Sequence, residues 1–554
     1  MSINYQATNN AAATEELKIL ASKFSVVFPD GNFDASMSAA QIFGVVSDNE
    51  TRSHVHEAED RIKDIESHAD KRIGFQKGFG SPSHAYIAHS LGDVVALQKK
   101  KMAIAIVHDK ISSEIADVLK WMNVAALIVE SPKMTGHLNM QIGPFGVSTL
   151  IAPDTIDAWK SIKEIPTGTP ITISPIGNEI GLYEKHLEIV KGIPLSYSQD
   201  IVCLYRSAAQ ECNLPYTQFK ANIDALDQIK NIFKYENNGI GLVRTEHFAL
   251  LDKFSRTHVK IILMGSTDDA DYHNLRVRQD EQMTELFSEV LLNRASSYIP
   301  CPVRIRLLDA PPDEFMDQNE YENLKQIVTE DNMRGVQMAL ARHGLYENQI
   351  DAIFTSYKEL GEQRLAIGLE IMVPTVKTRE ELLAVKKMVL DTAQRHGIAP
   401  SEFKFGMMLE TLEAVQNAKE LAPHIDFVSI GSNDLTGAAL GLSRTDMISL
   451  KKFRDADPDG KDPFITLHER VVTVITKAYN DIKEVNPSVT FSICGAQATD
   501  LDSLMKVKGA IKLDSASMPP SELNFNALQA DFCLACYRQE QPQTQPFKAA
   551  VCIP

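Results

Sequence analysis

The chain has 554 residues, of which 44% are hydrophobic and 23% charged, a composition that is ordinary for soluble globular protein and long enough for several domains. Its 73 acidic and 56 basic residues give a net charge of −17, which argues against nucleic acid as the main partner, because phosphate backbones are bound by clustered Lys and Arg. No apolar run is long enough to cross a membrane, and the N-terminus lacks the basic and apolar regions of a secretion signal. We therefore expect a cytoplasmic protein without a membrane partner.

Residues 1–217 divide into three segments that differ in their sequence patterns. Residues 1–101 lack a regular alternation of strands and helices but contain "HEAEDRIKDIESHADKRI", which is typical of an exposed helix, so we expect a small, mainly helical domain there. In residues 102–185, short β-branched runs alternate with polar turns and the helical stretch "SSEIADVLKWM", which predicts a small α/β domain. Residues 186–217 look like a helical linker.

From residue 218 to 554 the pattern changes to eight apolar, strand-like runs, each followed by helical sequence. The runs are "FKANI", "GIGLVR", "PVRIRLL", "LEIMVP", "FKFGMML", "DFVSIG", "TFSICG" and "AIKLDSA". Eight successive β/α units predict a (β/α)8 TIM barrel, whose active site lies on the loops at the C-terminal ends of the strands.

Chemically active side chains stand at the ends of these runs. They are Arg244, Arg306, Glu410, Asn433, Asp434 and Cys494. The arginines are planar, bidentate donors suited to phosphate or carboxylate. Glu410 and Asp434 are hard oxygen ligands of the kind that Mg²⁺ takes, and Cys494 could donate a proton. Together these groups predict a site for a small phosphorylated acid.

Six sequence blocks resemble, in this order, the phosphoenolpyruvate (PEP)-binding barrel of the PEP-utilising enzymes. They are "GIGLVRTEHFAL", "VRIRLLDAPPDEF", "LEIMVPTV", "FGMMLET", "DFVSIGSNDLT" and "SICGA". This family includes enzyme I of the sugar phosphotransferase system, PEP synthase and pyruvate phosphate dikinase.

The resemblance implies a role for each of these side chains. By position, Arg244 and Arg306 would hold the phosphoryl group, and Asn433 and Arg444 would complete the PEP site. Glu410 and Asp434 would ligate Mg²⁺, or alternatively Mn²⁺, and Cys494 would protonate the enolate to give pyruvate.

A histidine in "SPKMTGHLNM", His137, follows the apolar run "VAALIVE". A lone histidine is usually structural, but the sequence around His137 resembles the swivelling phosphohistidine domain that precedes the barrel in this family. The resemblance implies that His137 attacks the phosphorus of PEP, which suits an imidazole that is largely neutral near pH 7. A competing residue, His84 in "GFGSPSHAYIAHSLG", has Pro82 where the family has threonine, so we expect His84 to be a packing or surface residue.

The chain departs from the family pattern at several positions, including the following three. Gly136 replaces a serine beside His137, Gln337 stands where relatives usually carry an arginine, and Ala496 replaces a common glutamate. These changes remove outer anion-binding groups and leave the central ones, so reduced or specialised activity is an open alternative.

The barrel blocks are more similar to those of the dikinase, whereas the order of domains is similar to that of enzyme I. Only residues 1–101 precede the phosphohistidine domain, and they contain no glycine-rich nucleotide loop. We therefore predict a PEP–protein phosphotransferase of the enzyme I type, which passes the phosphoryl group from His137 to a histidine phosphocarrier such as HPr and forms a homodimer through its barrel. The alternatives are a dikinase- or PEP synthase-like enzyme without its ATP-grasp domain, and a non-catalytic PEP-sensing protein.

Overall fold

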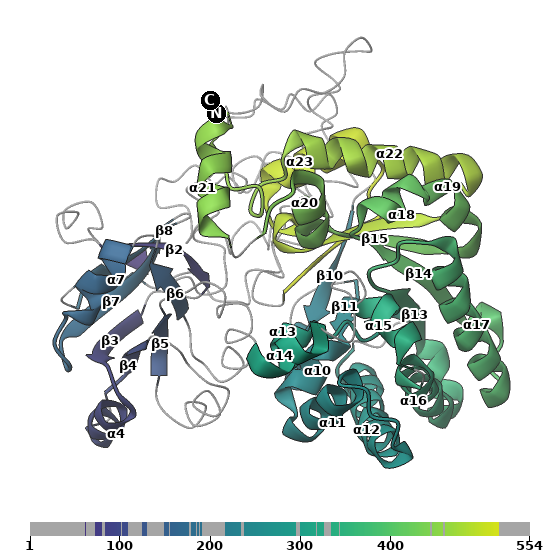
Figure 1. Ribbon diagram of the computed structural model, residues 1–554, viewed down its shortest axis with the longest axis horizontal. Helices are drawn as coiled ribbons and strands as arrows, with labels where there is room; N and C mark the ends of the chain where they lie inside the picture. The colour runs from purple at the N-terminus through teal and green to yellow at the C-terminus, as the bar shows by residue number, and fades with distance from the viewer. Residues whose placement is uncertain are drawn as a thin grey trace, which may run out of the picture. The chain divides into compact units, whose positions relative to one another are not determined.

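The computed structural model describes two parts of the chain, which belong to two compact units and are treated separately here (Figure 1). The described residues of the N-terminal unit are 61–62, 73–79, 83–100, 102–108, 124–129, 149–153, 156–176, 179–183, 186–187 and 189–190. Those of the C-terminal unit are 217–233, 238–294, 300–316, 318–325, 334–342, 344–443, 446–457 and 460–519.

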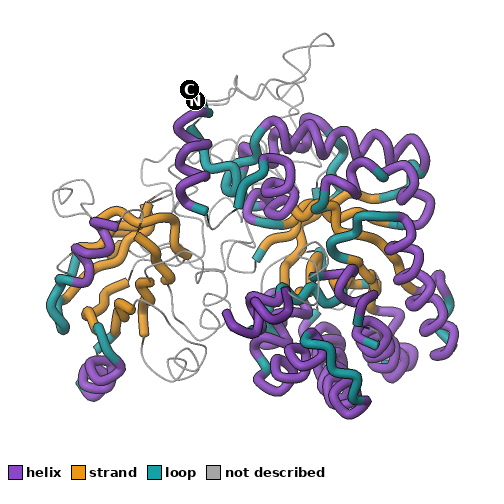
Figure 2. Tube along the Cα trace, in the orientation of Figure 1, coloured by secondary structure: helices purple, strands orange, loops and turns teal. Residues whose placement is uncertain are grey.

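The N-terminal unit is built on a closed sheet with the strand order β2-β6-β5-β4-β3-β7-β8 (Figure 2). These strands are β2 (Ile73–Phe79), β3 (Ser83–Ala88), β4 (Ile104–His108), β5 (Val124–Val129), β6 (Thr149–Pro153), β7 (Pro170–Ile176) and β8 (Glu179–Tyr183). The run from β3 through β4 and β5 to β6 is parallel, and the remaining pairs are antiparallel. A separate antiparallel pair joins β1 (Arg61–Ile62) to β9 (Ile189–Val190).

Two helices accompany this sheet, α4 (Leu91–Lys99) and α7 (Ile156–Lys163). Helix α4 begins at Ser90, whose hydroxyl accepts a hydrogen bond from the Asp93 N–H at 3.1 Å and so satisfies a free donor of the first turn. From α7, Trp159 and Ile162 pack into a core with alternate, buried residues of the strands, such as Ile87 and Ile128.

The small sheet starts earlier in the chain than residue 102, where we placed the beginning of the α/β domain. Strand β3 pairs with β4 in parallel and with β7 in antiparallel fashion, so residues 83–88 are an integral part of the sheet. Residues 1–60, which make up most of the expected helical domain, and most of the expected linker 186–217 lie outside the described residues.

The C-terminal unit is a closed barrel of eight strands in chain order, all of whose neighbours are parallel. The strands are β10 (Gln218–Ile223), β11 (Ile240–Arg244), β12 (Cys301–Arg306), β13 (Ile367–Val373), β14 (Phe403–Leu409), β15 (Phe427–Gly431), β16 (Thr490–Cys494) and β17 (Ser515–Met518). The predicted (β/α)8 barrel is thereby confirmed.

Helices surround the barrel strands (Figures 1 and 2). They are α9 (Ile229–Ile232), α10 (Thr245–Leu251), α11 (Lys253–Leu263), α12 (Asp269–Asn293), α13 (Pro312–Phe315), α14 (Gln318–Lys325), α15 (Gly335–Ala341), α16 (Leu345–Glu359), α17 (Arg379–His396), α18 (Leu412–Gln416), α19 (Ala418–Leu421), α20 (Ser432–Leu440), α21 (Met447–Ala456), α22 (Glu469–Val485) and α23 (Leu501–Ala510). Among the described residues, no helix is both long and apolar enough to span a membrane.

Seven of the eight predicted strand runs coincide closely with observed strands, and the last one is shifted. The run 510–516 was predicted as a strand, but Ala510 still belongs to α23, whose end is marked by a hydrogen bond from the Ile511 N–H to the Val507 carbonyl at 2.8 Å. The strand β17 begins only at Ser515, after Asp514 has bonded to β16 through its N–H and its carboxylate.

The lower part of the barrel interior is polar. Arg304 on β12 lies in register with Glu370 on β13, and its Nε donates to the Glu370 carboxylate at 2.7 Å. Arg304 also donates to the Ser492 hydroxyl and lies over the ring of Phe427, 4.0 Å from its centroid. A second buried cation, Lys220, is close enough to interact electrostatically with Glu370, and burial lowers the pKa of this lysine to about 8.

Candidate active site

The predicted chemical side chains of the barrel gather at one end of it. Because all eight strands are parallel, their C-terminal ends share one face, and we call the residues at and directly after these ends the barrel mouth. Arg244, Arg306 and Cys494 are the last residues of β11, β12 and β16, and Glu410 directly follows β14. Asn433 and Asp434 lie in the first turn of α20, directly after β15.

Arg244 is held by Asp224, which directly follows β10. The Arg244 Nη1 atom lies 3.1 Å from the Asp224 Oδ1 atom, and the His247 Nδ1 atom lies 2.8 Å from the same oxygen. Burial alone would raise the pKa of Asp224, but Arg244 and His247 outweigh it and hold this pKa well below its usual range. Arg244 is therefore oriented by a permanent anion, while 22% of its side chain stays exposed to a ligand.

Arg306 is more deeply buried and is fixed by two carboxylates. Its Nη2 atom donates to the Glu246 carboxylate and lies 3.7 Å from the Asp309 carboxylate, and its Nη1 atom faces the Met408 sulfur at 3.4 Å. Its Nε–H and the second Glu246 oxygen are buried without a hydrogen-bond partner among the described residues. A buried donor without a partner is unfavourable, so this N–H is available to an incoming oxygen.

The carboxylates Glu410 and Asp434 differ in their surroundings. Glu410 is 3% exposed, and one of its oxygens accepts a hydrogen bond from the Thr375 N–H at 2.6 Å. Burial first, and then the charge of Asp434, raise the pKa of Glu410 to about 8. The side chain of Asp434 is 45% exposed and accepts from Arg334 at 3.2 Å. The negative charge of this carboxylate pair is therefore not fully neutralised by the cations around it.

Cys494 is a buried thiol within the same group of side chains. It packs with Leu242, Met372, Met408 and Phe427 in the barrel interior, and its Sγ–H donates to the Ile430 carbonyl at 3.5 Å. Burial raises the pKa of this thiol, against the opposing influence of Arg244 and Arg306. The thiol thus stays protonated at neutral pH and is a possible acid.

The loop after Cys494 is tied to the first turn of α20. Gly495 has a positive φ of 99°, and a Cβ atom there would lie 2.3 Å from the Ser432 hydroxyl, so only glycine fits. The Asn433 side chain accepts the Ala496 N–H at 3.3 Å. This contact fixes the predicted substrate ligand Asn433 beside the proposed acid.

Several site residues were not singled out in the sequence, although Glu246, His247 and Asp309 stand within the quoted blocks. The others are Asp224, which directly follows β10, and Arg334, and each of the five holds another charged side chain. Arg334 donates to Asp309 at 3.0 Å through Nε and at 2.5 Å through Nη2. The motif "RTEH" carried a partial signal, because acidic and imidazole groups follow the arginine directly.

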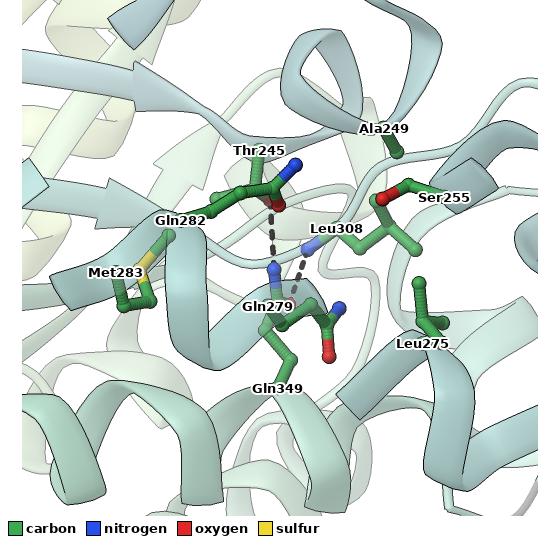
Figure 3. A pocket seen from close by; sticks show the side chains of 9 residues that line it. All are labelled: Thr245, Ala249, Ser255, Leu275, Gln279, Gln282, Met283, Leu308 and Gln349. Atoms are coloured by element: carbon green, nitrogen blue, oxygen red, sulfur yellow. Dashed lines mark hydrogen bonds between the residues drawn. The ribbon is translucent and has the colours of Figure 1, made fainter. Parts of the chain in front are cut away.

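A small cavity lies beside the segments that follow β11 and β12 and is lined by Thr245, Ala249, Ser255, Leu275, Gln279, Gln282, Met283, Leu308 and Gln349 (Figure 3). Gln349 bridges two loops of the barrel mouth: it donates to the Thr245 hydroxyl at 2.9 Å and accepts the Leu308 N–H at 2.8 Å. Thr245 follows Arg244, and its hydroxyl donates in turn to the Arg306 carbonyl at 2.9 Å. The residues that line the cavity therefore help to hold Arg244 and Arg306 in place.

Two predicted site residues, His137 and Arg444, lie outside the described residues. Strand β5 ends at Val129 and β6 begins at Thr149, so His137 falls in the connection between them. The competing histidine, His84, is on β3, where its Nδ1 atom lies 3.2 Å from the Thr172 hydroxyl and its ring stacks on His186 at 4.6 Å. These contacts are those of a packing residue.

Comparison with known families identifies the class of this protein. Residues 207–529 match the PEP-binding domain of the PEP-utilising enzymes, and this match covers more than half of the chain. The chain therefore belongs to the PEP-utilising enzyme family, as the resemblance of the six sequence blocks implied.

The similar proteins include several named pyruvate, phosphate dikinase. The chain is 29% identical to the protein of Rickettsia bellii over 483 residues, which cover 77% of this chain and 52% of that protein. It is 28% identical to the protein of Rickettsia prowazekii over 51% of this chain and 35% of that one, and 25% identical to the protein of Treponema pallidum over 67% and 45%. The chain thus spans about half or less of the length of these relatives.

Among solved structures, Haloferax volcanii malate synthase aligns with a TM-score of 0.31 at 10% identity, over 61% of this chain and 77% of that one. A likeness this weak carries no argument about function.

Proposed function

We propose that the chain catalyses the PEP–pyruvate half of a phosphotransfer reaction, in which the phosphoryl group of PEP moves to His137 and pyruvate is released. The observation that supports this most is the barrel mouth itself. Two arginines, a buried carboxylate and a protonated thiol share one end of a closed barrel, inside the segment that matches the PEP-binding domain.

The arginines would bind the anionic groups of PEP. Planar guanidinium groups bind phosphate and carboxylate with paired hydrogen bonds. Arg306 is fixed by Glu246, and its buried Nε–H has no partner in the part of the chain that the structure describes; Arg244 is fixed by Asp224 with part of its side chain exposed. Both are oriented before substrate arrives, which reduces the entropy lost on binding.

In the proposed step, a nitrogen of His137 attacks the phosphorus of PEP and forms a P–N bond. The bond from phosphorus to the enolate oxygen breaks, and its electron pair stays on the enolate. The Cys494 thiol then gives its proton to the methylene carbon, which yields pyruvate and a thiolate that regains its proton from solvent. In the reverse direction the same thiolate would remove a proton from pyruvate.

The carboxylate pair fits a divalent cation. Mg²⁺ is usually held by one or two carboxylates together with substrate oxygens and waters, and burial raises the pKa of Glu410 because its negative charge is poorly compensated. We propose that Glu410 and Asp434 hold Mg²⁺, or Mn²⁺, which when bound would neutralise charge on the phosphoryl oxygens. Within the described part of the chain, no group of three or more His, Cys, Asp or Glu residues could hold a metal.

For the onward acceptor, we favour a dikinase-type reaction, in which a nucleotide-binding segment or partner exchanges the phosphoryl group with His137. The relatives named above support this choice, because they carry the dikinase name. Transfer to a phosphocarrier such as HPr, sugar transport and a barrel homodimer remain predictions from the resemblance to enzyme I.

Labelling with ³²P-PEP tests the proposed step. We expect an acid-labile, alkali-stable phosphoryl group on the full chain, abolished by His137→Ala and retained in His84→Ala. Labelling that survives His137→Ala would refute the site. PEP binding without any labelling or pyruvate release would favour a PEP-sensing protein instead.

A further inference from the structure

Thr375 has an unusual backbone conformation in the loop after β13. Its φ is 51°, and among the described residues it is the only one other than glycine with a positive φ. This left-handed region is strained for a β-branched residue, because its Cβ atom approaches the backbone. Such strain persists only where the surrounding structure fixes the residue, and it is frequent at functional sites.

The start of α15 holds Thr375 in place. The Thr375 hydroxyl accepts the Val336 N–H at 3.1 Å and donates to the Gln337 Oε1 atom at 3.2 Å, while the Gln337 Nε2 atom donates to the Thr375 carbonyl at 2.9 Å. Gly335 makes this approach possible, because a Cβ atom there would lie 1.8 Å from the Thr375 hydroxyl.

Gln337 is itself anchored by the first turn of α17. Its Nε2 atom donates to one Glu381 oxygen at 3.0 Å, and the other Glu381 oxygen accepts the N–H groups of Lys377 at 2.8 Å and Thr378 at 2.9 Å. Glu381 thus caps α17 and fixes Gln337 at the same time. An arginine at position 337 would have no acceptor and could not accept a hydrogen bond from the Thr375 hydroxyl.

The strained backbone of Thr375 directs its N–H group towards Glu410. The Thr375 N–H donates to the Glu410 Oε1 atom at 2.6 Å. The other oxygen of Glu410 lies beside Gly431, where a Cβ atom would approach it to 3.0 Å. Among the described residues, the Thr375 N–H is the one hydrogen-bond donor to this buried carboxylate, and it therefore sets the orientation of Glu410. The position of this N–H depends on the hydrogen bonds between Gln337 and Thr375, which we call the Gln337 clamp.

We propose that Thr375 and Gln337 are positioning residues that hold Glu410 in the orientation needed to bind a divalent cation together with PEP. This inference rests on the proposed function, since it assumes that Glu410 is a metal ligand. Gln337 both donates to and accepts from Thr375, and these two hydrogen bonds help to compensate for the strain at that position.

The test compares two substitutions at one position in the full chain, Thr375→Val and Thr375→Gly. Both variants lose the hydroxyl bonds and keep the backbone N–H, but valine keeps the strain of a β-branched residue at positive φ, whereas glycine adopts a positive φ without strain. We expect Thr375→Val and Gln337→Ala to weaken Mn²⁺ binding at saturating PEP by about 10-fold or more, as removal of outer-shell partners does. Thr375→Gly should stay within about threefold of wild type, and Mn²⁺ binding is measured by electron paramagnetic resonance of the free ion.

A merely structural role predicts the opposite order, because glycine removes more contacts than valine. Hydrogen exchange of the residue 375 amide gives a readout without metal: it should be fast in Thr375→Val and Gln337→Ala and slow in Thr375→Gly.

Glu410→Gln separates the two proposals. If Glu410→Gln weakens Mn²⁺ binding but Thr375→Val and Gln337→Ala do not, the clamp is refuted and the proposed function stands. If Glu410→Gln binds Mn²⁺ as wild type does, the metal role and the clamp both fall.

Discussion

At the scale of single residues, the charged groups of the barrel mouth are compensated to different degrees. Asp224 lies against Arg244 and His247, which hold the pKa of this carboxyl well below its usual range against the effect of burial. Glu410 instead receives the Thr375 N–H and faces the like charge of Asp434, and its pKa is about 8. The difference marks Glu410 as the carboxylate whose charge is compensated less by the surrounding cations.

Glu410→Gln should therefore stabilise the metal-free protein in a pH-dependent way. With a pKa of about 8 in the folded state and 4.5 as its ordinary value, Glu410 binds a proton on folding between these limits. The contribution of Glu410 to the free energy of unfolding of the wild type is therefore largest at low pH and is lost as the pH rises towards 8. In EDTA, the variant should gain roughly 3–5 kcal/mol over wild type at pH 8 and less than about 1 kcal/mol at pH 5. Denaturant unfolding at both pH values checks this, and an equal gain at both would contradict the assignment.

Cys494→Ala separates binding from proton transfer. The buried thiol contacts the Ile430 carbonyl and lies near both arginines, but it carries no charge with which to hold PEP. The variant should bind PEP nearly as well as wild type and release pyruvate about 10²–10⁴-fold more slowly, the usual contribution of general acid catalysis. Binding is measured by calorimetry and release by stopped-flow assay, and equal rates of release would rule out Cys494 as the acid.

At the scale of elements, the register between neighbouring strands decides which side chains meet. Arg304 and Glu370 pair because β12 and β13 are aligned residue for residue over their length. The same alignment brings Arg306 to the level of Met372 at the barrel mouth. Arg304 of the structural ion pair and Arg306, the proposed substrate ligand, therefore lie two residues apart on one inward-facing side of β12.

Removing Glu370 should destabilise the barrel strongly. Glu370→Ala leaves Arg304 buried without its carboxylate, next to the buried Lys220. Loss of one partner of a buried pair costs about 3–5 kcal/mol. Lys404 provides the control, since its side chain is 57% exposed and its Nζ atom lies 3.9 Å from Glu370; Lys404→Gln should cost less than about 1 kcal/mol. Similar losses in the two variants, measured by urea unfolding, would argue against a buried ion pair as the source of stability.

The strands could be predicted from the sequence because each one is a short apolar run followed by an amphipathic segment. The last strand was misplaced because Ile511 and Leu513 in "AIKLDSA" alternate with polar residues as in a strand, whereas the contacts of Asp514 with β16 decide where β17 begins. Asp224 and Asp309 were not identified because their importance comes from arginines on other segments of the chain. The clamp on Thr375 was equally hidden, since a positive φ at threonine has no sequence signature.

At the scale of the whole molecule, the chain distributes the proposed chemistry over its two units. The barrel matches the PEP-binding domain, and His137 belongs to the N-terminal unit, in the connection between β5 and β6. The relatives named dikinase are about twice as long as the matched part or longer. The proposed reaction with PEP and pyruvate is therefore separable from the onward transfer.

Exchange of ¹⁴C-labelled pyruvate into PEP tests this central claim most directly, because it needs His137, the arginines and Cys494 but no second acceptor. With Mg²⁺ and unlabelled PEP, we predict that the wild-type chain moves the label into PEP, and that His137→Ala and Cys494→Ala do so at least about 10²-fold more slowly. Wild-type protein that binds PEP yet exchanges no label, or His137→Ala protein that exchanges at the wild-type rate, would contradict the account.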